Sequence, residues 1–250
     1  MKRIATLLAV LLGLSAASAS FAAGGNERIE SFEAAKKMLT GQVYRDHRRT
    51  LYCDVPFDKN KATRLPAGFE KSIHARRAGR IEYEHVVAAE NFGRTFPEWR
   101  EGSPSCVTAR GERFKGRKCA EAASREYRLM QADMHNLFPA VGSVNALRSN
   151  FRFTQFPKDV PCTFGSCCMK VADRRAEPPD AAKGVVARTH FYMARTYPRF
   201  TLSAYHERLF AIWNEKHPVT AWECERQRRI AELQGNENAV TAAACRAAGL

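Results

Sequence analysis

Eight cysteines constrain the fold of this 250-residue chain more than any other feature. An even number of cysteines can pair completely in an oxidising compartment, and each disulfide limits how far apart its two segments can lie. Cys162, Cys167 and Cys168 lie close together, as cysteines also do in metal sites. A zinc site needs two paired ligand knuckles, and this cluster has no partner of that kind. We therefore interpret the cysteines as a disulfide framework.

The amino terminus is consistent with that interpretation. Lys2 and Arg3 precede an apolar run at residues 4–14, and small residues follow at 17–22, the pattern of a cleaved signal peptide. The apolar run is too short for a membrane-spanning helix. We expect residues 1–22 to be a signal peptide and residues 23–250 to form one exported, soluble domain, located in the periplasm or the medium.

The charge of the chain indicates a polyanionic partner. The formal net charge is +14, and it falls to +12 once Lys2 and Arg3 are removed. Nucleic acid, lipopolysaccharide and an anionic membrane surface are the three candidate partners, and charge alone does not choose among them. A basic exported protein that is merely soluble and positive is the fourth possibility.

The pair Glu84-His85 is the strongest candidate for chemistry. A carboxylate can hold a hard divalent cation, and an imidazole can accept a proton near neutral pH. Together they supply two of the parts needed to hydrolyse a phosphodiester. On its own the dipeptide also occurs by chance. Residues 81–87 have the pattern of a strand, in which adjacent side chains point to opposite faces, so we expect a bend or bulge where the strand ends.

Apolar spacing predicts helices at residues 29–41, 119–134, 185–197 and 202–213, with another after Pro218 that ends at Gly235. In the last of these we place Glu223, Arg226, Arg229 and Glu232 on the outside. Residues 88–92 begin a helix or turn, and residues 44–67 form an irregular segment with one strand. Pro139 and Gly142 break the helix before them, which leaves Asn136 in a connection, where its carboxamide can coordinate a metal or cap a turn. Residues 95–118 form a cationic loop closed by cysteines, which is either a solvated loop or a binding element.

With these pieces in place, the sequence resembles the bacterial endonuclease I family of exported, sugar-non-specific nucleases from about residue 30 onward. The matching blocks include 84–87 with 92–93, 116–119, 133–137 with 139–142, 144–145 with 148–150, 187–189, 213–214, 222–224 and 234–236. The resemblance implies a single mixed α+β domain built around a ββα-metal (His-Me finger) motif, a hairpin followed by a helix that holds one divalent cation.

The resemblance also implies the site residues. His85 is the general base, Glu84 and Asn136 are the metal ligands, and Arg117 binds the scissile phosphate. The expected activity is Mg²⁺-dependent hydrolysis of DNA, and of RNA, to 5′-phosphate products, with Ca²⁺ or Mn²⁺ able to replace Mg²⁺. We expect contacts to the phosphate backbone, no membrane partner and a monomer. The alternative is an exported nucleic-acid-binding or uptake protein that cuts nothing.

The sequence departs from the family pattern at several positions. Ala88 replaces a usual Pro, Leu147 a usual Asp, and Gln131 a common Glu. From the family we expect the disulfides Cys106–Cys119 and Cys224–Cys245. The other four cysteines, at positions 53, 162, 167 and 168, can pair in three ways, and family position favours Cys53 with Cys167.

Overall fold

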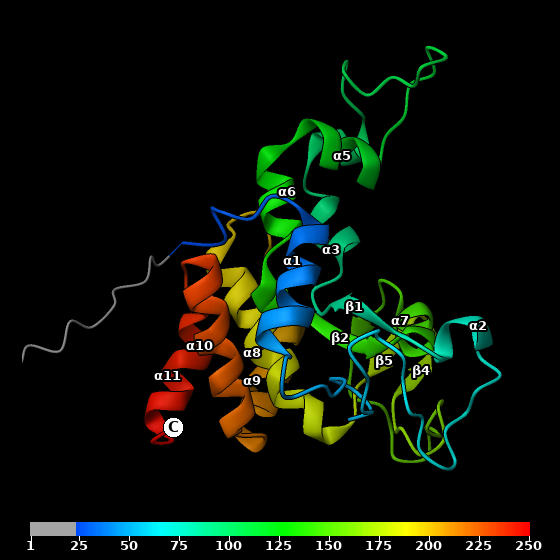
Figure 1. The fold of residues 1–250 in the computed structure, drawn as a ribbon, viewed down its shortest axis with the longest axis vertical. Helices are drawn as coiled ribbons and strands as arrows, with labels where there is room; N and C mark the ends of the chain where they lie inside the picture. Colours follow the sequence, from blue (N-terminus) through cyan, green and yellow to red (C-terminus); the bar gives the residue numbers. More distant parts are fainter. Residues whose placement is uncertain (1–23) are drawn as a thin grey trace, which may run out of the picture.

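The computed structural model of this chain describes residues 24–250. The expected signal peptide at residues 1–22 lies outside the described part. No helix within residues 24–250 combines the length and the apolar character that crossing a bilayer requires. Figure 1 shows helices gathered on one side of a short central ribbon, small strands on the other, and one segment that stands away from the body.

The centre of the fold is a two-stranded antiparallel ribbon, β1 (Ile81–His85) and β2 (Leu137–Val141). Its register runs without a break from Ile81↔Val141 to His85↔Leu137. Strand β1 was expected, whereas β2 was not, because Pro139 was interpreted as a helix breaker. The carbonyl of Pro139 accepts a hydrogen bond from the main-chain N–H of Leu51 at 2.8 Å, so this residue directs its main-chain groups away from β1. The ribbon therefore loses no hydrogen bond to the missing N–H of proline.

A helix, α7 (Gly142–Arg148), follows β2 without a loop and packs on both strands. The two antiparallel strands are joined by a long connection rather than by a short turn. The long connection between them contains α3 (Ala89–Gly93), α4 (Pro97–Arg100), α5 (Arg117–Ala123), α6 (Arg125–Gln131) and the short 3₁₀ helix η2 (Met134–Asn136). The single helix expected at 119–134 is thus two, because the Ser124 side chain caps a new helix by accepting from Tyr127 N.

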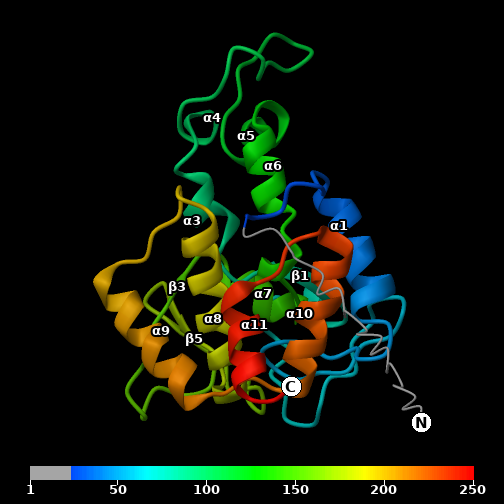
Figure 2. The same ribbon diagram turned by 90° about the vertical axis from the view of Figure 1, so that its left-hand side faces the viewer.

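Four long helices cover one side of the ribbon: α8 (Asp180–Thr196), α9 (Ala204–Lys216), α10 (Ala221–Gln234) and α11 (Ala239–Ala247). Helix α8 packs on α9 and α11, and α11 on α10; Figure 2 shows the four side by side. Helix α1 (Phe32–Met38) continues into the π-helical turn Leu39–Val43, which packs on α10. The short helix α2 (Ala75–Ala78) packs on α7. Three short strands, β3 (Arg152–Phe153), β4 (Lys170–Ala172) and β5 (Arg175–Glu177), form a separate small sheet.

Three of the four charged residues of α10 that we placed on the outside are buried, which corrects our expectation, whereas Glu232 is exposed as expected. Glu223, Arg226 and Arg229 are each no more than 9% exposed. Glu223 takes a bidentate ion pair from Arg188 of α8, and Arg226 donates to the carbonyls of Met134 and Leu137 at 2.8 and 2.7 Å. These charges can be buried because each is paired or hydrogen bonded. They fasten α10 to α8 and to the start of β2.

All eight cysteines are paired, as expected. The disulfides are Cys53–Cys167, Cys106–Cys119, Cys162–Cys168 and Cys224–Cys245. Cys53–Cys167 joins segments 114 residues apart and connects the irregular amino-terminal segment to the small sheet. The other three close short loops.

Candidate functional site

A pocket of about 570 Å³ lies along β1. Every residue of β1 lines it, together with residues of α1, α2, α3, α4, α5 and α7. The lining includes three of the four residues that the sequence predicted, Glu84, His85 and Arg117. These residues come from separate parts of the chain, which the ribbon and the helices between its strands bring together.

No bulge is needed for Glu84 and His85 to reach the same pocket, contrary to our expectation. Their side chains point to opposite faces of the ribbon. Within residues 24–250, β1 forms a sheet with β2 alone, and the other edge of β1 is paired only at its start, where Ile81 N donates to Lys61 O at 2.9 Å. The pocket follows this edge, and side chains from both faces border it.

His85 is held as a neutral imidazole with one free nitrogen. Its Nε2 lies 2.8 Å from the carbonyl oxygen of Gln131, which can only accept, so Nε2 carries the proton. Nδ1 has no hydrogen-bond partner among residues 24–250 and keeps its lone pair. Burial lowers the pKa of His85 to about 3, and the positive charge of Arg117 acts in the same direction. At neutral pH the ring is therefore uncharged, and Nδ1 is the nitrogen whose lone pair is free to accept a proton.

Glu84 is fixed through one of its two oxygens. Its Oε1 accepts hydrogen bonds from the Tyr52 hydroxyl at 3.0 Å and from Arg148 Nη1 at 2.8 Å. Oε2 takes no hydrogen bond within the described part of the chain and is not sealed from solvent. Burial raises the pKa of Glu84 to about 6, although the adjacent Arg148 guanidinium opposes that shift. At neutral pH Glu84 therefore presents one ionised, accessible oxygen.

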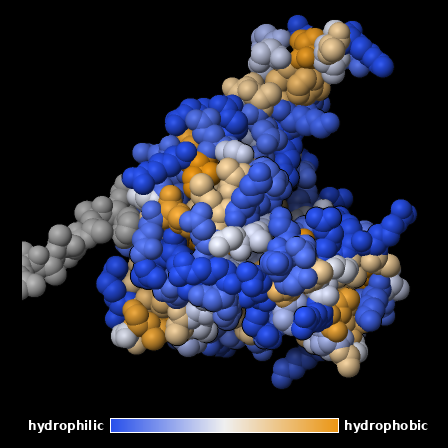
Figure 3. Space-filling model, viewed as in Figure 1, coloured by the Kyte–Doolittle hydropathy of each residue, from blue (hydrophilic) through white to orange (hydrophobic). Residues whose placement is uncertain are grey.

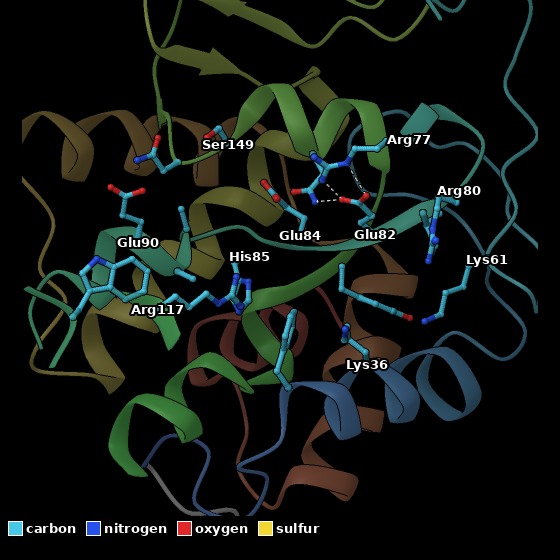
Figure 4. Close-up of a pocket in the computed structure, with 18 residues that line it drawn as sticks. Lys36, Lys61, Arg77, Arg80, Glu82, Glu84, His85, Glu90, Arg117 and Ser149 are labelled. Carbon is cyan, nitrogen blue, oxygen red and sulfur yellow. Dashed lines mark hydrogen bonds and ion pairs between the residues drawn. The ribbon is translucent and has the colours of Figure 1, made fainter. Parts of the chain in front are cut away.

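Arg117 is the first residue of α5 and points toward His85 in Figure 4. Its Nε donates to Gln131 Oε1 at 2.8 Å, and its guanidinium lies 5.3 Å from the ring centre of Phe32. Both contacts leave the terminal nitrogens of Arg117 without a protein partner among residues 24–250. Gln131 thus orients Arg117 with its side chain and His85 with its carbonyl. Sequence reasoning noted Gln131 only as a departure from the family pattern.

Asn136 does not reach this pocket. It is fully buried and absent from the lining. Its Oδ1 accepts from the N–H of Val87 at 2.7 Å and its Nδ2 donates to the carbonyl of Val87 at 3.0 Å. The side chain therefore pairs with the main chain just beyond β1. The structure does not bring Asn136 together with Glu84, the residue with which we expected it to share a metal.

Asn145, which we did not assign from the sequence, does line the pocket. It lies on the first turns of α7, the helix that packs on β1. Its Nδ2 donates to Glu82 Oε2 at 2.7 Å, and this bond leaves Oδ1 without a partner in the described residues. Arg77 holds Glu82 from the other side. The sequence did contain a signal for Asn145, because this residue belongs to the matching block 144–145, which follows the block 139–142 at the end of β2.

The chemistry of these donors fits a hard divalent cation better than a softer one. Glu84 Oε2 and Asn145 Oδ1 are both unpaired oxygens at one pocket, and oxygen is the ligand that Mg²⁺ prefers. In the described part of the chain, no group of three or more His, Cys, Asp or Glu side chains is placed to hold a metal. Mg²⁺ commonly uses one or two protein oxygens and keeps several waters, so two donors suffice.

The pocket is positive overall. Figure 4 shows Lys36, Lys61 and Arg80 on the side away from Arg117, with Glu82 and Glu84 next to each other between them. The lining has five lysine or arginine residues and three glutamates: Lys36, Lys61, Arg77, Arg80 and Arg117, against Glu82, Glu84 and Glu90. This balance suits a substrate with repeated negative charges.

Comparisons with known proteins agree with this chemistry. The sequence model of the family described as Endonuclease I matches residues 36–244. An extracellular deoxyribonuclease of Aeromonas hydrophila is 38% identical and covers 84% of this chain and 88% of its own. A periplasmic deoxyribonuclease of the same species is 37% identical, with 85% of each chain covered. Endonuclease-1 of Buchnera aphidicola subsp. Acyrthosiphon pisum is 35% identical over 84% of this chain and 80% of its own.

Proposed function

Because this chain belongs to the endonuclease I family, it is a nuclease, and we propose that it is a Mg²⁺-dependent endonuclease that cuts DNA and RNA with little sequence preference. The observation that carries the proposal is the set of groups around one pocket: a neutral imidazole, two free oxygens and an arginine. These are the groups that phosphodiester hydrolysis requires.

His85 acts as the general base. Its Nδ1 takes a proton from a water molecule, whose oxygen then attacks phosphorus, while Gln131 O holds the imidazolium through Nε2. The bond from phosphorus to the 3′ oxygen breaks, and that oxygen takes a proton from a solvent water, which leaves a 5′-phosphate and a 3′-hydroxyl. The rings of Phe32 and Phe92, with centres 4.8 and 6.2 Å from that of His85, limit the rotation of the imidazole.

Arg117 binds the phosphate that is cut. Its terminal nitrogens can contact two phosphate oxygens at once, which a lysine cannot do in the same geometry. Glu84 and Asn145 would hold the metal, with Asn145 in place of the Asn136 that we first expected. A bound Mg²⁺ supplies charge that stabilises the phosphate oxygens and the leaving oxygen.

Low sequence preference follows from the composition of the pocket. Its charged residues suit phosphate groups, which carry no base identity. We therefore expect affinity to fall steeply as salt rises. We also propose that the protein acts as a monomer. We propose further that it is exported to the periplasm or the medium, as the names of its relatives say of those proteins.

Plasmid cutting by His85→Ala tests the proposal. Parent, His85→Ala and the control His47→Ala are incubated with supercoiled plasmid and with RNA, each with Mg²⁺ and with a chelator. His47 lies against Trp222 and does not line the pocket, so it is a matched histidine change. We expect the parent and the control to cut only with Mg²⁺, and His85→Ala to be slower by about 100-fold or more. Cutting by His85→Ala within a few-fold of the parent would mean that another group is the base. Binding without cutting by the parent would favour the non-catalytic alternative.

A further inference from the structure

Residues 101–116, between α4 and α5, form an ordered arm that stands clear of the body (Figures 1 and 3). Val107 and Arg113 form an antiparallel bridge along it. Thr108 N donates to Glu112 O at 2.8 Å and Gly111 N to Thr108 O at 2.9 Å, which closes a tight turn at the tip. Gly111 has φ +79°, a conformation that suits glycine in such a turn. The arm is therefore a short hairpin with a defined shape.

The base of the arm belongs to the wall of the catalytic pocket. Cys106 is joined to Cys119 in α5, and Gly116 N donates to the carbonyl of Trp99 at 3.0 Å. Trp99 and Arg117 both line the pocket, so the arm begins and ends beside lining residues. The disulfide fixes where the arm points relative to Arg117.

The arm carries three cations, at positions 110, 113 and 115, and two glutamates, Glu101 and Glu112. Glu101 pairs with Arg100, whereas Glu112 forms no ion pair in the described part of the chain. Arg110, Arg113 and Lys115 are exposed, and none has an ion pair in the described part of the chain. Several other exposed arginines do pair, as Arg94 does with Glu90 and Arg228 with Glu225. Unpaired cations at close spacing repel one another, so a polyanion that binds them removes an unfavourable interaction.

The size of the arm matches several nucleotides. Arg110 lies four positions after Cys106 in the chain, a reach of about 13 Å at about 3.3 Å per residue. Phosphates of one strand advance about 3.4 Å per nucleotide along a duplex, so the tip lies about four nucleotides beyond the disulfide. A substrate cut beside Arg117 extends far enough to pass along the arm.

We propose that this arm is a second phosphate-binding site, which holds the backbone of a nucleic acid several nucleotides from the phosphate that is cut. The inference rests on the proposed function in one respect: a nucleic acid cut beside Arg117 is taken to continue from that residue along the arm. Arg110, Arg113 and Lys115 each contact phosphate oxygens and make no contribution to the chemical step. An arm that contacts only the backbone adds affinity without base preference.

The test compares two triple variants in a His85→Ala background, which slows cutting while binding is measured. Arm variant Arg110→Ala/Arg113→Ala/Lys115→Ala is matched by Arg208→Ala/Lys216→Ala/Arg246→Ala, an equal loss of charge on α9 and α11, which lie far from the arm in both ribbon views. Fluorescence anisotropy measures binding of a labelled duplex of about 24 base pairs, about 80 Å long. Salt is varied from about 50 to about 200 mM, over which such affinities fall strongly.

Three phosphate contacts contribute about −2.7 to the slope of log affinity against log salt. Over a fourfold rise in salt, the affinity of the background protein should therefore fall about 40-fold more than that of the arm variant. The control variant should keep the slope of the background within about one contact. Equal melting temperatures establish that each variant is folded.

An arm variant with the slope of the background would overturn the proposal. So would an arm variant that keeps its affinity for duplex but no longer sediments with vesicles of phosphatidylglycerol and phosphatidylcholine, because the arm would then bind a lipid surface. Plasmid cutting by the protein with His85 restored is measured separately. If that protein does not cut, the proposed function fails, whereas a changed salt slope still supports the arm as a phosphate-binding site.

Discussion

Replacing Asn145 and Asn136 by alanine, one at a time, separates metal binding from folding. Asn136→Ala removes the partner of both main-chain groups of Val87, and each buried unpaired group costs about 1–3 kcal/mol. The resulting loss of about 2–6 kcal/mol lowers the melting temperature by roughly 5–20 °C for a chain of this size. Asn145 is only partly buried and makes one hydrogen bond, to Glu82, so Asn145→Ala costs about 1 kcal/mol.

The increase in melting temperature on adding Mg²⁺ shows which asparagine binds the metal, without a measurement of activity. An ion at a hundredfold excess over its dissociation constant stabilises the folded state by about 2.7 kcal/mol, which raises the melting temperature by about 5–11 °C. Asn136→Ala should keep this increase. Asn145→Ala, with affinity about 100-fold weaker, should keep about 0.4 kcal/mol of it, an increase of about 1 °C.

Glu84→Gln serves as the matched control, since it removes the charge of the other proposed ligand at nearly constant volume. It should abolish the Mg²⁺-dependent increase as Asn145→Ala does. If instead Asn145→Ala keeps the full increase and Asn136→Ala loses it, the argument from the pocket lining is refuted. Asn136 would then be the ligand in spite of its burial.

Two further predictions concern Gln131 and His190. Gln131→Met removes the side-chain hydrogen bond to Arg117 but keeps the main-chain carbonyl that holds His85. We therefore expect kcat/KM to fall about tenfold, the equivalent of about 1.4 kcal/mol. In an Arg117→Ala background the same change should have no effect on kcat/KM. Burial lowers the pKa of His190 to about 3, so below its ordinary pKa of about 6.5 the unfolded chain takes up a proton that the folded chain does not. Urea unfolding should therefore find that the parent loses about 2 kcal/mol more than His190→Leu between pH 7 and pH 5; equal losses would contradict the assignment.

Much of the site could be predicted because its residues are consecutive or occur in distinctive blocks. Glu84 and His85 are adjacent, and Arg117 belongs to the block 116–119. All three line one pocket, as the prediction required. The strand at residue 81 and the helices α8, α9 and α10 were also predicted, because apolar residues recur along them at regular spacing.

The predictions that failed depend on which side of an element a residue faces. Pro139 was read as a break, but in a two-stranded ribbon its main chain faces away from the partner strand, toward Leu51. Arg226 and Arg229 have the spacing of a solvated helix face. They are buried because their partners, which include the carbonyl of Met134 and the carboxylate of Asp46, come from distant segments. No local pattern in the sequence reveals such partners.

The same reasoning explains why Asn136 was a plausible ligand and why its position still matters to the site. The ladder between the strands stops at His85, so the main chain beyond it needs other partners. Asn136 supplies them for Val87, and Arg148 donates to the carbonyls of His85 and Val86 at 2.8 and 2.6 Å while also holding Glu84. These two buried side chains fix the backbone that carries the carboxylate and the imidazole. Asn136 therefore acts on the site through the main chain, and its loss should impair folding before it impairs metal binding.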